Sequence, residues 1–199
     1  MWNIIAALLS LAIFAGVALM QDSQTMHRIE RAAIQARETS AAFELNQIAN
    51  AASAYLTASN APAGTTVSVT ELVSAGYLPD GFSQQGPFGQ TPVAMAVNSP
   101  AGVTGKSLLV YYTDAPTTLG DQPLTIQNEM GVAMGIAQEL DNMEQGQTGF
   151  SSGVDYGPSG VAPTPLILPY TGSRVSLVQA TASLAEHFPD PMIAVNVIP

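Results

Sequence analysis

Histidine and carboxylate side chains are the first candidates for chemistry in this chain, because they ligate metals and transfer protons. The histidines are His27 and His187, and His187 has the carboxylates of Glu186 and Asp190 close by. His27 precedes Arg28 on the polar side of a long helical pattern. Zinc and catalytic sites need ligands that converge from separate elements. We therefore interpret His187 as a solvated loop residue and predict no metal site.

A second group of carboxylates comprises Asp121, Glu129, Glu139, Asp141 and Glu144. Their spacing does not match a calcium-binding loop, and the last three are typical of a helix end and the loop after it. No serine lies in Gly-x-Ser-x-Gly or Ser-x-x-Lys, and no phosphate-binding Gly-x-x-x-x-Gly-Lys occurs. The sequence therefore predicts neither enzymatic activity nor a cofactor.

The composition excludes several classes of protein. The 199 residues include no cysteine, which rules out disulfide-stapled modules and cysteine zinc sites. With 15 acidic and 5 basic side chains, a net charge of −10 leaves too little positive charge to neutralise nucleic-acid phosphates. A hydrophobic content of 47% is too high for a disordered chain. Only 10% of the residues are charged, where about 25% is typical.

The acidity belongs to the later part of the chain. Beyond residue 50 the only bases are Lys106 and Arg174, although most of the acids lie there. We expect this part to repel nucleic acids and anionic membrane surfaces.

Residues 1–20 carry no charged side chain, and their only polar residues are Asn3 and Ser10. As a helix they would extend about 30 Å, the thickness of a bilayer core. A cleaved signal peptide would begin with Lys or Arg and end at a small-x-small site, and this segment does neither. The sequence therefore predicts a retained membrane-spanning helix.

The orientation of this helix stays open. Its flanking bases all follow the span, at Arg28, Arg31 and Arg37. The positive-inside rule would then place the C-terminal part in the cytoplasm. Removal of a basic leader would reverse that assignment.

Helical periodicity continues well beyond the apolar segment. Residues 28–58 contain no Gly or Pro, and apolar residues recur every three or four positions until the breaker sequence at 59–64. We predict one helix over residues 2–58, about 85 Å long. Its apolar part is rich in small residues that allow helices to pack closely, among them Ala6, Ala7, Ser10, Ala15 and Gly16.

Residues 59–199 predict a globular α+β part with an antiparallel sheet. The expected strands are 93–97, 107–113, 174–180 and 193–198, and the expected helices are 70–75 and 125–144. Residues 145–173, rich in Gly, Ser and Pro, predict a long surface loop. The spacing of Gly131 and Gly135 is typical of a close helix–sheet contact.

This organisation resembles the type IV pilins. The strongest likeness lies in Glu71-Leu-Val-Ser-Ala-Gly-Tyr-Leu-Pro-Asp-Gly-Phe82 and Gly86-Pro-Phe-Gly-Gln-Thr91. These segments look like the loop between helix and sheet in the pilins of plasmid-borne thin pili, including shufflon-type tip pilins. Gly76, Pro79, Gly86, Pro87, Phe88 and Gly89 carry this loop motif. The resemblance covers roughly residues 1–115.

The resemblance implies the pilin fold and a structural role. Met1 corresponds to the N-methylated first residue that a prepilin peptidase exposes in the type IVb subclass. Most type IV pilins have Glu at the fifth mature position, where this chain has Ile5, and Asn3 is the polar residue nearby. The implied partners are copies of the same chain in a helical filament, the pilus assembly machinery and, before assembly, the inner membrane. The implied location is a cell-surface pilus used for adhesion or conjugative contact.

Two alternatives remain at this point. One is a pseudopilin of a secretion or DNA-uptake machine, with the same fold and shorter fibres. The other is a single-span anchored protein with an acidic extracytoplasmic domain. In all three, residues 1–58 form the long helix and residues 59–199 the globular domain.

Overall fold

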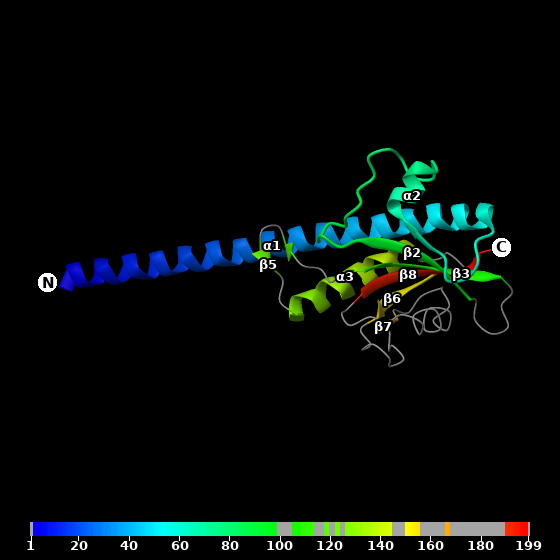
Figure 1. Cartoon of the computed structure of the whole chain (residues 1–199). Helices are drawn as coiled ribbons and strands as arrows, with labels where there is room; N and C mark the ends of the chain where they lie inside the picture. Colours follow the sequence, from blue (N-terminus) through cyan, green and yellow to red (C-terminus); the bar gives the residue numbers. More distant parts are fainter. Residues whose placement is uncertain are drawn as a thin grey trace. The chain divides into compact units, whose positions relative to one another are not determined.

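In the computed structural model, a long helix opens the chain and an antiparallel sheet forms the centre of the part that follows it (Figure 1). The structure describes residues 2–98, 105–113, 118–119, 122–123, 126–144, 150–155, 166–167 and 190–198. It describes the backbone alone for residues 2–24, 26, 27, 98, 118–119, 122–123, 126–130, 144, 150–151, 153–155, 166–167, 190–192 and 194–198. The chain divides into two compact units, residues 1–36 and residues 37–199. The second unit is called the head below. The predicted strand 174–180 lies outside the described residues.

Helix α1 extends over Trp2–Ser59, which confirms the predicted helix. It ends where Asn60 adopts a left-handed conformation with φ 47°. The N–H of Asn60 donates to the carbonyl of Thr57, and the N–H of Ala61 donates to the carbonyl of Leu56. This pair of bonds is a Schellman motif, which satisfies carbonyls that would otherwise lack partners at the helix end.

One side of α1 within the head is buried and rich in alanine. The buried residues recur at helical spacing and are Ala41, Ala42, Leu45, Ile48, Ala49, Ala51, Ala52 and Leu56. Alanine lets the helix backbone lie close to its neighbours, while each buried Leu or Ile stabilises the fold by about 1.5–3 kcal/mol. The Tyr112 hydroxyl of the sheet donates a hydrogen bond to the carbonyl of Ala41 at 3.4 Å, which fastens helix to sheet.

Among the residues whose side chains the structure describes, no helix combines the length and the apolar character needed to cross a membrane. The predicted span, residues 1–20, lies among the residues whose side chains are not described.

The sheet places its strands in the order β1-β2-β3-β8-β6-β7, and every neighbouring pair is antiparallel. The strands are β1 (Thr66–Ser68), β2 (Pro92–Asn98), β3 (Lys106–Tyr112), β6 (Phe150–Asp155), β7 (Leu166–Ile167) and β8 (Asp190–Ile198). The last strand of the chain, β8, therefore lies between β3 and β6. Its insertion joins residues from both ends of the head in one sheet, with Tyr111 opposite Met192 and Phe150 opposite Val195.

Three of the predicted strands are confirmed, since β2, β3 and β8 cover residues 93–97, most of 107–113 and 193–198. A short two-stranded hairpin of β4 (Thr118–Leu119) and β5 (Gln122–Pro123) was not predicted. The three-residue β1 was not predicted either, because so short a strand shows no alternation.

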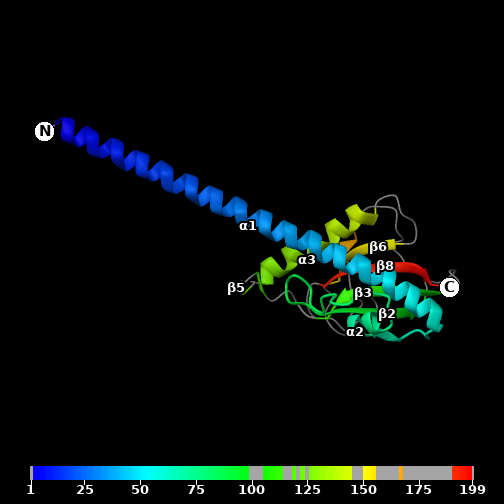
Figure 2. The same ribbon diagram turned by 90° about the horizontal axis from the view of Figure 1, so that it is seen from above.

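Two further helices belong to the head, and both were predicted. They are α2 (Val69–Ser74) and α3 (Ile126–Glu144). Helix α3 packs against β6 and β8 and buries Val132, Ile136 and Leu140. Figures 1 and 2 show it beside the part of α1 that belongs to the head. The head is thus α+β, as predicted.

The prediction of a continuous loop over residues 145–173 was wrong. Strands β6 and β7 lie inside this range, and β6 pairs with β8 over its whole length, from Phe150 to Asp155. Its sequence, Phe-Ser-Ser-Gly-Val-Asp, has the weak strand propensity of a loop. Hydrogen bonding to β8 overrides that propensity, because β8 would otherwise present an unpaired edge.

The expectation of a helix–sheet contact at Gly131 and Gly135 was also wrong. A Cβ atom added at Gly131 would meet nothing within 4 Å. One added at Gly135 would collide with the carboxyl group of Glu38 on α1. The close approach at Gly135 is therefore to α1.

Candidate functional site

The candidate residues of the N-terminal segment lie beyond what the structure describes in detail. Met1 is outside the described residues. The others lie on the backbone of α1 with undescribed side chains, and they are Asn3, Ile5, Ala6, Ala7, Ser10, Ala15 and Gly16. Their predicted roles in processing and helix packing stay predictions.

The loop motif begins at the end of α2. Ser68 caps this helix by accepting a hydrogen bond from the N–H of Glu71, and its own N–H donates to the Glu71 carboxylate at 2.8 Å. The hydrogen bonds that the Ser68 N–H and hydroxyl donate to the Glu71 carboxylate hold the pKa of Glu71 below its usual value. After α2, Gly76 adopts a φ of 77°, which lets Tyr77 N–H reach back to the carbonyl of Leu72. Gly76 is thus a helix-ending residue that turns the chain.

The second half of the loop motif, residues 86–91, lies close against the aromatic ring of Tyr112. A Cβ atom added at Gly86 would lie 2.7 Å from the ring of Tyr112, so only glycine lets the loop pass at this point. Gly89 closes the turn by donating its N–H to the carbonyl of Gly86, and Phe88 between them is fully buried. Pro87 is partly exposed. The motif thus fixes the loop on Tyr112, whose hydroxyl in turn reaches α1.

An uncharged face of α1 is exposed on the head. We call it the outer face; its residues recur every three or four positions and are Ser40, Phe43, Gln47, Asn50, Ala54 and Ala58. Phe43 is 57% exposed, which is unusual for so large an apolar side chain. Asn50 donates to the Asn46 side chain at 2.8 Å and so stays on the helix surface. The outer face lacks the charges that ordinarily cover an exposed helix.

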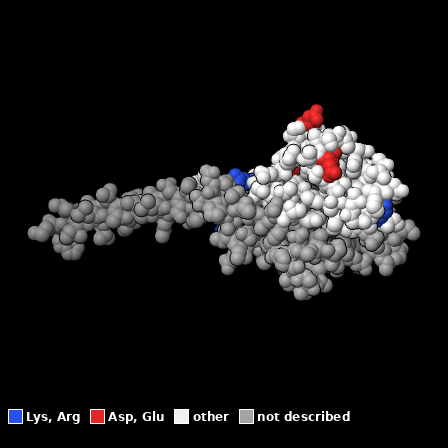
Figure 3. Space-filling model, viewed as in Figure 1, with Lys and Arg blue, Asp and Glu red and all other residues white. Residues whose placement is uncertain are grey.

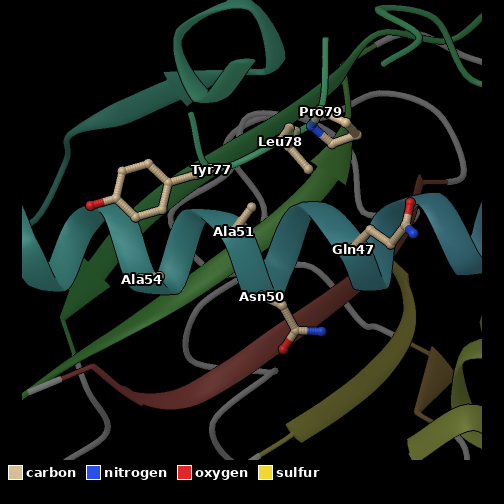
Figure 4. Close-up of a pocket in the computed structure, with 7 residues that line it drawn as sticks. All are labelled: Gln47, Asn50, Ala51, Ala54, Tyr77, Leu78 and Pro79. Atoms are coloured by element: carbon tan, nitrogen blue, oxygen red, sulfur yellow. The ribbon is translucent and has the colours of Figure 1, made fainter. Parts of the chain in front are cut away.

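A shallow groove of about 430 Å³ lies where the outer face meets the loop motif (Figure 4). Its lining comes from α1 and from the segment after α2, and consists of Gln47, Asn50, Ala51, Ala54, Tyr77, Leu78 and Pro79. The Tyr77 ring, 38% exposed, meets the Tyr55 ring edge to face at 5.5 Å between centroids. No charged side chain lines this groove. The structure thus brings Pro79 of the motif to the outer face, a juxtaposition that the sequence did not predict.

The low charge of the sequence extends to the surface that can be seen. Figure 3 shows one face of the molecule, and the described residues there are mostly uncharged, with few acidic and basic groups. The Lys106 ammonium donates to the carbonyl of Ala61, just past the end of α1. A cation at a helix C-terminus is favourable for the helix dipole.

Two glutamates of α1 are partly withdrawn from water inside the head. Burial raises the pKa of Glu44 to about 7. Its Oε1 atom is buried and has no hydrogen-bond partner within the described part of the head. Burial also raises the pKa of Glu38, and the charge of Glu139 raises it further. Nothing in the local sequence marks either residue of α1, because a helix face that another element covers has no local signal.

The described residues contain no group of three or more His, Asp or Glu side chains that could hold a metal ion. Glu186 and His187 lie outside the described residues, while Asp190 begins β8. The side chain of His27 is not described.

Comparison with known protein families and with curated proteins gave no match to this chain. The assignment of a function therefore depends on the sequence pattern and on the described surface.

Proposed function

We propose that the chain is a type IV pilin-like subunit that polymerises through its N-terminal helix into an extracellular filament. The observation that carries this proposal is the single helix from Trp2 to Ser59. Residues 1–20 carry no charged side chain, and the part of the helix from Arg37 onward belongs to an α+β head. Such a helix needs an apolar surround, which the membrane supplies before assembly and neighbouring helices supply afterwards.

The outer face supports the proposal. Phe43, Gln47 and Ala54 present an uncharged helical surface next to an uncharged groove. An acidic protein with a net charge of −10 would repel its own copies across a charged interface. A contact surface without charges avoids this repulsion.

The loop motif supports the pilin fold rather than a binding role. Its glycines and Phe88 shape the connection between α2 and β2 and seat it on Tyr112. A motif with this structural role is expected to be shared by proteins of one fold, whatever their filaments bind.

The proposal is tested with the full chain in cells that carry a type IV assembly machinery. Electron microscopy of sheared surface material should show filaments that an antibody against the head decorates. The variants Phe43→Glu and Ala54→Glu, on the outer face, should abolish filaments. The variant Gln84→Glu, at an exposed loop position, is the matched control and should assemble normally.

Processing gives an independent test. Mass spectrometry of the mature subunit should find a methylated Met1 with no residue before it. An unprocessed chain that is anchored in the membrane but never forms filaments would instead favour the single-span anchored protein.

A further inference from the structure

A glutamate of α1 lies against α3 in the head, close enough to a glutamate of α3 for that charge to act on it. The carboxyl group of Glu38 on α1 occupies the space that a side chain at position 135 of α3 would need, and Gly135 leaves that space open. Glu139 lies four residues after Gly135, which places it on the same face of α3. Both glutamates are half-buried. The glycine thus creates a seat for a carboxyl group beside a second one.

No described cation compensates this pair of acids. Arg37 adjoins Glu38 on α1, and adjacent residues of a helix do not face each other. Lys106 is bonded to Ala61, 23 residues further along the chain, or about 34 Å along the helix axis. Among the described residues, Glu139 is the one charged group that acts on the pKa of Glu38, and like burial it raises this pKa.

We propose that Glu38, Gly135 and Glu139 form a pH-sensitive latch between α1 and α3, fastened when the Glu38 carboxyl group is protonated and loosened when it is ionised. A protonated Glu38 leaves a single negative charge at the contact. Two ionised groups in a half-buried site repel each other and lose hydration. Gly135 is essential to the latch because a larger residue would push the Glu38 carboxyl out of its seat.

The direction of the response follows from the raised pKa of Glu38. The folded head holds this proton to a higher pH than the unfolded chain does, so the latch is strongest in acid. Its contribution is lost as the pH rises from about 4.5 through the raised pKa. This inference concerns the head alone and goes beyond the proposed filament, so it stands or falls separately from assembly.

Hydrogen exchange of the full chain in neutral detergent micelles tests the latch. Exchange of the α3 amides of residues 131–142 is measured from pH 5 to pH 8 and corrected for intrinsic rates. The chain carries Glu44→Gln, so that titration of Glu44 does not contribute. We expect protection of α3 to fall as the pH rises over this range, because ionisation of Glu38 weakens its contact with α3.

Two variants and a control decide the outcome. Glu38→Gln in the same background should make the protection of α3 independent of pH, and Gly135→Ala should do the same by displacing the carboxyl group. Glu71→Gln, on α2, should retain the full response. An unchanged response in Glu38→Gln, or no response in the parent chain, would overturn the proposal.

Discussion

At the scale of single residues, the head depends on a few positions where the size or charge of one side chain decides the packing. Gly86 lets a loop pass the ring of Tyr112, and Gly135 lets a carboxyl group lie against α3. Glu44 keeps a carboxyl oxygen in a place where no described group bonds to it. The sequence indicated that Gly86 matters, through the loop motif. The sequence could not indicate which residues lie against Gly86 and Gly135, because Tyr112 and Glu38 are distant from these glycines in the chain.

The fit at Gly86 predicts the effect of adding one methyl group. Gly86→Ala should lower the free energy of unfolding by about 1–3 kcal/mol, because the loop or the Tyr112 ring must shift. Gly131→Ala is the matched control, since it adds the same methyl group in open space within a helix. It should raise the free energy of unfolding by about 0.5–1 kcal/mol. Urea denaturation followed by circular dichroism measures both, and equal effects of the two variants would refute this account of Gly86.

The raised pKa of Glu44, about 7, predicts how stability depends on pH. The folded head holds the Glu44 proton up to about pH 7, while the unfolded chain releases it near 4.5. The contribution of Glu44 to the free energy of unfolding is therefore at its full value below pH 4.5 and is lost as the pH rises to 7. Because the side chain is partly exposed, the loss should be about 1–2 kcal/mol, less than the full shift would give.

Glu44→Gln isolates this contribution. The difference in unfolding free energy between wild type and variant should change between pH 4.5 and 7 and be constant above about pH 8. A constant difference across the whole range would show that folding does not shift the pKa of Glu44.

At the scale of elements, the spacing of apolar residues and the positions of Gly and Pro predicted the structure that depends on residues close together in the chain. The recurrence of apolar residues every three or four positions predicted α1, and the Asn-Ala-Pro-Ala-Gly sequence at 60–64 predicted its end. Asn60, directly after the last residue of α1, adopts a left-handed conformation that ends the helix. Strand β6 was not predicted, because its Ser-Ser-Gly centre has no strand signal and its pairing with β8 is long-range. The contact between α1 and α3 was missed for the same reason.

The start of α2 gives a prediction for one element. Ser68→Ala removes the hydroxyl that accepts from the Glu71 N–H and should lower the free energy of unfolding by about 1 kcal/mol. Thr70→Ala, at an exposed position of the same helix, should change it by less than about 0.5 kcal/mol. If both substitutions had the same small effect in urea denaturation, the capping bond would not contribute to stability.

At the scale of the whole molecule, the scarcity of charge has two sources. Residues 1–20 carry no charge at all, and the outer face of α1 in the head carries none either. A protein that exposes both of these uncharged surfaces would associate with its own copies. In the proposed filament, both surfaces form contacts between subunits.

Truncation tests the role of the first segment directly. A chain that begins at residue 26 should be monomeric in analytical ultracentrifugation without detergent, because it lacks the apolar part of α1. Filaments formed by this shortened chain would contradict assembly through the N-terminal helix.

The central claim is that α1 carries assembly, and the most direct test is electron microscopy of surface filaments from cells that express the full chain. The account predicts filaments decorated by antibody against the head, lost in Phe43→Glu and retained in Gln84→Glu. Normal filaments from Phe43→Glu, or no filaments from the processed wild-type chain, would contradict it.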